Sequence, residues 1–118
     1  MKKRVYIAGP VTNNITYKKD FAEVADRLTG MGLTPINPVE PAPKNLTYKE
    51  YIDRGLDLLK LCDLICVICY NVESKGRELE VCYAETLNMP RINADRDRHT
   101  DAWVLSVDEC WPGMFGGE

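Results

Sequence analysis

A cluster of polar side chains stands where a predicted strand passes into a predicted helix. The stretch "NVESKGRELEVCYAETLNMP" follows a very apolar run, and the polar residues near its beginning are Ser74, Gly76, Arg77, Glu78 and Glu80. A carboxylate at such a place can serve as a nucleophile or as an acid–base group, and a serine can hold a ligand oxygen. The same residue types also suit an ordinary helix start, because serine caps helices and the helix dipole favours acidic residues in the first turn. The position of the stretch in the fold has to decide between the two interpretations.

The spacing of apolar residues predicts strands and helices that alternate along the chain. Strands are predicted at about 5–8, 33–38, 63–70 and 90–94, and helices at about 16–31, 48–61 and 75–87. The run "DLICVICY" is apolar throughout, which is typical of a strand buried on both faces of a parallel sheet. The tail from about residue 96 is predicted to add one more short strand or a helical turn.

This alternation predicts the fold class. Strands that alternate with helices form βαβ units, in which a parallel sheet carries helices on its faces. We therefore expect one α/β domain over residues 1–118, a doubly wound three-layer structure of the flavodoxin or Rossmann-like kind with a parallel sheet of four to five strands. Ligands bind such sheets outside the carboxyl ends of the strands. That rule selects "AGPVTNN" after the first strand and "NVESKGRELE" after the third, and we expect these two segments to be neighbours.

The helix that follows Ser74 should turn one face to the sheet. Successive helical side chains lie about 100° apart. This spacing predicts a buried face made of Leu79, Cys82, Tyr83, Thr86 and Leu87. Glu78 and Glu85 then face water, whereas Glu80 falls at the edge of the buried face, where a carboxylate could look across the end of the sheet.

Composition excludes several classes of function. The chain has 118 residues and a net charge of −3, and its pI is about 5.2. An acidic balance gives no support to a nucleic acid polymer or an anionic membrane as partner. No apolar run approaches the roughly 20 residues that span a bilayer, and five cysteines without a disulfide framework indicate free thiols. We therefore expect a cytoplasmic protein.

The cysteines raise one alternative, a metal or cluster enzyme. Cys62, Cys66 and Cys69 have the spacing C-x3-C-x2-C, which matches an iron–sulfur loop. A cluster needs a flexible loop, however, and Cys66 and Cys69 fall in a predicted strand three positions apart, so that they point to opposite faces. Buried core thiols are the favoured interpretation. His99 lies in a charged loop without a second histidine at ligand spacing, and we expect neither a metal nor another cofactor.

Two motifs together resemble a known family. "VYIAGP" and "SKGRELEVCYA" are similar to the corresponding segments of the nucleoside 2-deoxyribosyltransferase superfamily, which includes relatives that hydrolyse deoxynucleoside 5′-monophosphates. The shared features are an aromatic-x-x-Gly turn after the first strand, an aspartate that opens a later strand, and a Gly-x-x-x-Glu helix start. In this chain they are Tyr6 with Gly9, Asp63, and Gly76 with Glu80. The resemblance covers about residues 4–94 and agrees with the predicted order of elements.

The resemblance implies glycosyl chemistry at an N-glycosidic bond. Glu80 would attack C1′ of the sugar as the base leaves, forming a covalent ester that a second base or water then opens. Tyr6 would orient the nucleophile, although a core tyrosine is the equal alternative. Ser74 would hold a sugar hydroxyl or a 5′-phosphate with the help of helix N–H groups, or would simply cap the helix. Gly9 and Pro10 would shape the floor under the sugar, and Gly76 would let a ligand approach the backbone.

The sequence also departs from the family pattern. The aspartate that assists the leaving base in the monophosphate hydrolases aligns with Gly55, and of the flanking residues Asp53 and Asp57 we favour Asp57 for this role. The glycine two residues after the nucleophile is Cys82 here, and Pro10 stands where those hydrolases have a serine. A non-catalytic nucleotide-binding domain of the same fold therefore stays open as the alternative to an enzyme. A domain this small often gains stability by association, so we expect a homo-oligomer.

Overall fold

A five-stranded sheet forms the centre of the fold, which was obtained as a computed structural model describing residues 2–11, 14–39, 45–69 and 74–107. The strands are β1 (Arg4–Ala8), β2 (Thr34–Ile36), β3 (Leu64–Ile68), β4 (Arg91–Arg96) and β5 (Trp103–Val107). The helices are α1 (Tyr17–Gly30), α2 (Tyr48–Lys60) and α3 (Lys75–Thr86). The strand order is β2-β1-β3-β4-β5. The predicted α/β class and the alternation of elements are confirmed.

The sheet is parallel except at one edge. β1 pairs in parallel with β2 and β3, and β3 pairs in parallel with β4, but β5 runs antiparallel to β4. The expectation of an entirely parallel sheet was therefore wrong for the last strand. Residues 97–102 are too few for a helical crossover, so the chain turns back as a hairpin. The Asp97 N–H donates to the Ala102 carbonyl oxygen and closes this turn.

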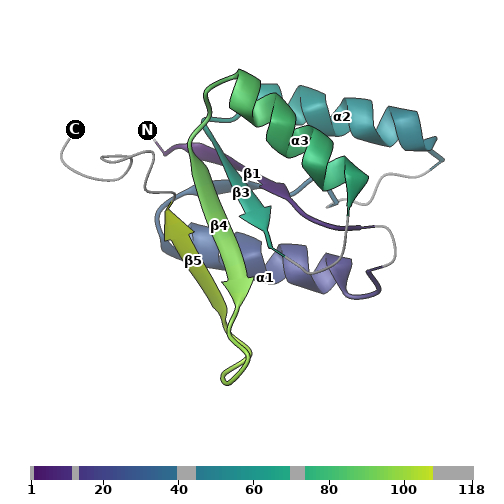
Figure 1. Ribbon diagram of the computed structural model, residues 1–118. Coiled ribbons are helices and arrows are strands. Elements are labelled where there is room, and N and C mark those ends of the chain that lie inside the picture. Colours follow the sequence, from purple (N-terminus) through teal and green to yellow (C-terminus); the bar gives the residue numbers. More distant parts are fainter. Residues whose placement is uncertain (1, 12–13, 40–44, 70–73, 108–118) are drawn as a thin grey trace.

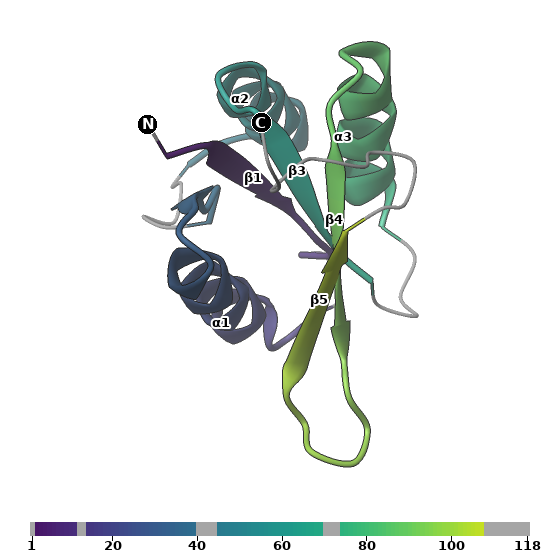
Figure 2. The same cartoon turned by 90° about the vertical axis from the view of Figure 1, so that its left-hand side faces the viewer.

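The helices cover both faces of the sheet. Figures 1 and 2 show α1 alone on one face and α2 with α3 side by side on the other. Each face has its own buried cluster, and Phe21, Val24 and Leu28 of α1 pack on the first face. Leu59 of α2 and Ala84 of α3 pack on the second. All five residues of β3 are buried, as its continuous apolar sequence predicts for a central strand.

The strand order places a switch point between β1 and β3. From β1 the chain crosses to β2 on one side, and β3 then returns to the other side of β1. Ala8 at the end of β1 is paired with Val67 near the end of β3. The beginning of the segment after β1 and the end of β3 are thus neighbours, at the edge where doubly wound sheets bind ligands. The segment after β3 lies in part outside the described residues, which resume at Ser74.

The buried face of α3 differs from the predicted one. Glu80 and Ala84 are the buried residues of this helix, whereas Leu79 is 50% exposed and Leu87 is 43% exposed. Cys82 and Thr86 are exposed as well. The prediction was correct for the exposed Glu78 and Glu85 and in part for Tyr83, which is partly buried and packs against the second cluster. The helix has apolar residues on several sides, so spacing alone could not select the face. The packing of α3 against α2 through small residues selected it instead.

Three smaller points complete the fold. The tail was predicted to add a short strand or a helical turn, and it forms the strand β5. The residues after 107 lie outside the part of the chain that the structure describes. Asp63 precedes β3 at the end of the sheet opposite the switch point, where its Oδ2 accepts a 2.9 Å hydrogen bond from the Arg4 N–H. Among the described helices, none is long and apolar enough to cross a membrane.

Candidate active site

A buried carboxyl group and a buried phenol meet at the switch point. The hydroxyl of Tyr6, in β1, donates a hydrogen bond to Oε2 of Glu80, in α3. Tyr6 is 0% exposed and Glu80 is 7% exposed. Within the described residues no hydrogen bond to the other oxygen, Oε1 of Glu80, is found. The structure therefore brings together two of the residues that the sequence selected, and it leaves one carboxyl oxygen available to a ligand.

Burial changes the acidity of both groups. Removal from water raises the pKa of Glu80 from 4.5 to about 7, and the hydrogen bond from Tyr6 opposes this shift in part. The pKa of Tyr6 lies far above its usual value because of burial first and of the charge of Glu80 second. Tyr6 is therefore a fixed hydrogen-bond donor at any physiological pH. Glu80 changes its charge near neutrality, which is typical of groups in active sites.

Gly55 of α2 makes room for this pair. A Cβ atom at position 55 would lie 2.7 Å from Oε2 of Glu80 and 2.8 Å from the Tyr6 hydroxyl oxygen. Both distances are shorter than a Cβ atom tolerates, so a side chain at position 55 would force Glu80, Tyr6 or α2 to shift. The backbone of α2 thus closes directly over the Tyr6–Glu80 hydrogen bond and excludes water from it. Position 55 is where the resemblance aligns an aspartate of the monophosphate hydrolases. Here it is a glycine, and the space of the missing side chain is taken by the Tyr6 hydroxyl and the Glu80 carboxyl group.

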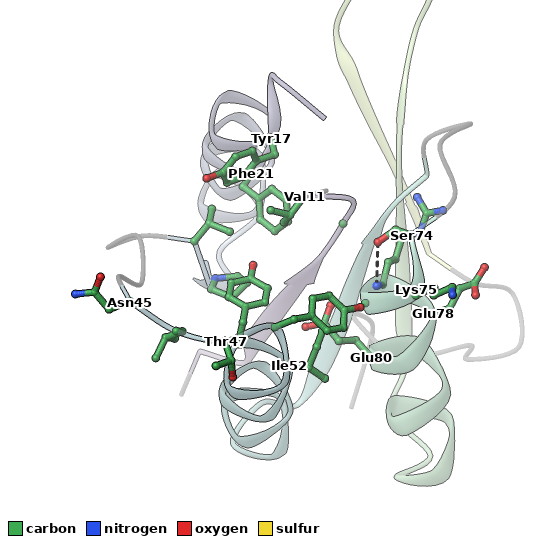
Figure 3. Close-up of a pocket in the computed structure, with 18 residues that line it drawn as sticks. Val11, Tyr17, Phe21, Asn45, Thr47, Ile52, Ser74, Lys75, Glu78 and Glu80 are labelled. Carbon is green, nitrogen blue, oxygen red and sulfur yellow. Dashed lines mark hydrogen bonds between the residues drawn. The ribbon is translucent and has the colours of Figure 1, made fainter. Parts of the chain in front are cut away.

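A cavity of about 830 Å³ opens beside Glu80. Its volume lies within the range of ligand sites, about 300–1,000 Å³. Figure 3 shows that the walls come from the start of α1, the start of α2 and the start of α3, with Glu80 pointing toward α2. Gly9, at the end of β1, contributes to the lining. The cavity thus lies at the carboxyl ends of β1 and β3, as the rule for doubly wound sheets predicts.

Aromatic side chains form one side of the cavity, and the sequence interpretation missed them. Tyr17 and Phe21 line it from α1, and Tyr48 and Tyr51 line it from α2. Tyr51 is half-buried, and burial together with the charge of Glu80 raises its pKa to about 12. Aromatic faces of this kind stack on flat, conjugated rings. Phe21 is also part of the buried cluster on the α1 face, and Tyr51 packs against that cluster, because residues at one helical spacing can serve both the core and the cavity wall.

The start of α3 forms the opposite side. Ser74 caps the helix, since its Oγ accepts a 3.1 Å hydrogen bond from the Arg77 N–H, and it also lines the cavity. The capping interpretation of Ser74 is therefore confirmed. Lys75 and Arg77 add positive charge to the lining. The Arg77 guanidinium donates a 3.1 Å hydrogen bond to the carbonyl of Ile68, at the end of β3.

Gly9, Gly76 and Pro10 were predicted to shape the ligand site, and each also has a contact within the protein that explains the residue type or its position. Gly9 lines the cavity, and a Cβ atom there would lie 3.0 Å from Cδ1 of Ile68. Gly76 also lines it, but its missing side chain accommodates Ile52, whose Cδ1 would be 3.1 Å from a Cβ at position 76. Pro10 is buried beside the cavity without being part of its lining, and its carbonyl accepts a 2.9 Å hydrogen bond from the Asn14 side chain.

Asp57 is the predicted catalytic residue that the structure does not bring to the cavity. Its side chain is 76% exposed and forms an ion pair of 3.6 Å with Lys60. Asp57 lies two positions after Gly55, and a two-residue step along a helix turns a side chain through about 200°. Position 55 faces Glu80, so position 57 has to face water. Asp53 is exposed as well, in an ion pair with Lys49.

The cysteines within the described residues belong to the core or the surface. Cys66 packs in the cluster under α1, and Cys62 packs in the cluster under α2 and α3. The two thiols therefore lie on opposite faces of the sheet, and Cys69 is exposed. Within the described ranges no group of three or more His, Cys, Asp or Glu residues is arranged to hold a metal ion.

An ion-pair network fixes the start of α1, which carries part of the cavity wall. Arg96 of β4 lies 3.2 Å from the Asp20 carboxylate and 2.9 Å from that of Glu23. Its guanidinium stacks 4.6 Å from the centre of the Trp103 ring, and the Trp103 indole donates to Glu23 at 3.0 Å. Asp20 is 1% exposed. The β4–β5 hairpin thereby holds α1, a contact between distant segments that no local pattern announced.

A family model matches residues 3–92, and its description is "Domain of unknown function (DUF4406)". The chain belongs to this family. No curated protein matches the sequence.

Three solved structures share the fold. A 2-deoxyribosyltransferase from Leishmania mexicana is 24% identical with a TM-score of 0.62, and the match covers 80% of this chain and 65% of that protein. A 2-deoxyribosyltransferase from Bacillus psychrosaccharolyticus is 20% identical with a TM-score of 0.61, covering 75% and 69%. The CMP N-glycosidase BcmB from Clostridium botulinum is 17% identical with a TM-score of 0.55, covering 85% and 75%. The chain of this DUF4406 protein thus spans less than two thirds of the Leishmania protein, and the fold resemblance expected from the two motifs is confirmed.

Proposed function

We propose that this DUF4406 protein is an enzyme that cleaves or transfers at the N-glycosidic bond of a nucleoside or its 5′-monophosphate, with Glu80 as the nucleophile. The observation that carries the proposal is the Tyr6–Glu80 pair at the wall of a ligand-sized cavity. The solved structures that share the fold are enzymes named for deoxyribosyl transfer and CMP N-glycoside cleavage. At identities of 17–24% these structures are evidence for the fold alone. The proposed activity is therefore argued from the residues of the cavity.

In this mechanism each partner of Glu80 has a role, which the contacts support. Tyr6 holds Oε2, which leaves Oε1 to form the bond with C1′ of the sugar. The transition state resembles an oxocarbenium ion, and a carboxylate next to C1′ stabilises that positive charge before it traps the sugar as an ester. Gly55 keeps bulk water away from the pair. The raised pKa of Glu80, about 7, means that the nucleophilic anion becomes more abundant as the pH rises through neutrality.

The two sides of the cavity suit the two ends of a nucleotide. The aromatic side, with Tyr51 and Tyr17, offers faces on which a base can stack. The start of α3 offers Ser74, Lys75 and backbone N–H groups, which suit a sugar hydroxyl or a 5′-phosphate. Gly9 forms part of the floor between them. No group in this mechanism requires a cofactor.

The test is mass spectrometry of the intact protein after mixing with deoxynucleosides and their 5′-monophosphates, together with chromatography of the small molecules. We expect free base and a sugar-sized adduct that maps to Glu80. Glu80→Gln should keep the fold and lose both products. Base release that continues undiminished in this variant would refute the role of Glu80.

A non-catalytic nucleotide-binding domain is the second candidate. It is favoured by the absence of a helix carboxylate at position 55, where Gly55 faces Glu80. In that case a nucleotide would raise the melting temperature, and neither free base nor an adduct would appear. The same mixing experiment separates the two functions.

A further inference from the structure

Among the described residues, none is placed to donate a proton to the leaving base, and this limits the substrates that the site can cleave. A neutral base leaves as an anion unless an acid protonates it, and a positioned acid accelerates such a step by about 10²–10⁴-fold. Among the described residues, the carboxyl groups that line the cavity are Glu78 and Glu80. Glu80 is engaged by Tyr6. Glu78 is exposed, and Figure 3 shows its side chain pointing away from Glu80.

The other titratable groups near Glu80 are poorly suited to this task. Tyr51 has a pKa of about 12, so it releases its proton reluctantly. Tyr6 has an even higher pKa and is bound to Glu80. Gly55 does more than lack a carboxylate, because a Cβ atom there would lie 2.7 Å from Oε2 of Glu80 and 2.8 Å from the Tyr6 hydroxyl oxygen. An acidic side chain at position 55 therefore requires the Tyr6–Glu80 pair or α2 to shift.

We propose that the substrates of this site are N-glycosides whose base already carries a positive charge, such as an N-alkylpyridinium nucleotide or an N7-alkylated purine nucleotide. A cationic ring leaves as a neutral molecule and needs no proton. The inference rests on the proposed function, since it takes Glu80 as the nucleophile, and it narrows the class of base.

The part of the cavity formed by Glu80 and the aromatic rings fits such a ring in charge, and the positive charges of Lys75 and Arg77 lie on the side formed by the start of α3. Glu80 is a buried carboxyl group, and a positive charge next to it favours the ionised form that attacks the sugar. The rings of Tyr17, Phe21 and Tyr51 line the same space, and aromatic faces attract cations within about 6 Å. A volume of about 830 Å³ leaves room for a nucleotide with a substituted base.

The step balances without an additional reactant. The C1′–N bond breaks and its electron pair stays on the ring nitrogen, which neutralises the ring. Oε1 of Glu80 forms a bond to C1′ and loses its negative charge in the ester. Water then adds its hydroxyl group to C1′, its proton goes to solvent, and the Glu80 carboxylate is restored.

A matched panel of substrates tests the inference. We would measure kcat/KM for dGMP and for 7-methyl-dGMP, which share sugar and phosphate and differ in the charge of the base, with nicotinamide mononucleotide as a cationic ribonucleotide. Spontaneous decay is subtracted, and Glu80→Gln serves as the control. We expect at least about 100-fold higher kcat/KM for a cationic member than for dGMP, in line with the contribution of a missing acid. We also expect kcat/KM for the pyridinium nucleotide to rise with pH to a plateau without a descending limb, because no group has to stay protonated.

The outcomes separate the two proposals. Comparable kcat/KM for dGMP and its methylated form, both lost in Glu80→Gln, would overturn the inference and leave the proposed function standing. A descending limb for the pyridinium nucleotide would reveal a required acid and would also overturn the inference. If wild type releases no more base than Glu80→Gln from any member, the proposed function fails and the inference fails with it.

Discussion

The substitution Gly55→Ala probes the closest contact in the site. The added methyl group would lie 2.7 Å from Oε2 of Glu80, so roughly 0.6 Å of movement is needed to reach a normal C···O separation of about 3.3 Å. Overpacking of this kind costs about 1–3 kcal/mol. Alanine in place of glycine within a helix returns about 1 kcal/mol through backbone entropy. We expect a net loss of about 1 kcal/mol, which lowers Tm by roughly 4 °C in a domain of this size.

The same movement displaces the nucleophile. Small misplacements of reacting groups are costly, with about 100-fold lost for 1 Å, so we expect kcat/KM to fall by about 10–100-fold. Gly30→Ala is the matched control, because a Cβ at the end of α1 meets nothing within 4 Å. This variant gains the higher helix propensity of alanine and creates no close contact. The difference in Tm between the two variants therefore measures the cost of the contact with Glu80 and Tyr6. Equal Tm and equal activity in both variants would refute the packing of α2 on the Tyr6–Glu80 pair.

Three further substitutions, with Lys49→Ala as a control for the last, test the charges and hydrogen bonds of the molecule. Because the pKa of Glu80 is raised to about 7, the folded protein holds a proton that the unfolded chain releases, and stability falls by about 3 kcal/mol as the pH rises from about 4.5 to 7. Glu80→Gln should remove this fall. In thermal unfolding, the Tm of the variant relative to that of wild type should therefore be higher at pH 7.5 than at pH 4.5. An equal Tm difference at the two pH values would contradict a raised pKa of the buried Glu80 carboxyl group. Tyr6→Phe removes the hydrogen bond that lowers the pKa of Glu80, so the rising limb of kcat/KM should move to higher pH, and an unmoved limb would mean that Tyr6 has no influence on the charge of Glu80. Arg96→Ala leaves Asp20 buried without its cation. It should lower the free energy of unfolding, measured by denaturant titration, by about 2–3 kcal/mol. This loss is smaller than that for breaking a fully buried ion pair, because Arg96 is partly exposed. Lys49→Ala breaks an exposed pair and should cost less than about 0.5 kcal/mol, so equal losses in the two variants would show that the Arg96 network is ordinary surface charge.

The sequence predicted the elements well because each carries a local signal. The apolar run of β3 and the serine cap of α3 are properties of a few consecutive residues, and both occur in the structure. The end of the sheet at which Glu80 lies also followed from a general rule of doubly wound folds. The antiparallel direction of β5 was not predicted, because it depends on the short connection of residues 97–102 and the apolar pattern of the strand carries no information on direction.

The site could be predicted only in part, because it depends on contacts between elements. Glu80 was placed at the edge of the buried face of α3, yet it is one of the two buried residues of that helix. The reason lies on α2, where Gly55 leaves space for a carboxylate, and nothing in the sequence of α3 contains that information. For the same reason Asp57 was placed in the site by counting from a motif, whereas the rotation of α2 turns it to water.

The Tyr6–Glu80 hydrogen bond also constrains how the protein is made. Its two residues are 74 positions apart in the chain. At a synthesis rate of about 5–20 residues per second, roughly 4–15 seconds pass on the ribosome between the two. β3 begins 58 residues after Tyr6 (64 − 6), so for most of this time β1 lacks its central partner in the finished sheet. An apolar strand without its partner is a site of aggregation until the partner arrives. The Tyr6–Glu80 pair therefore forms only after β3 and the first turns of α3 have been made, so under the proposed function turnover begins no earlier than that point.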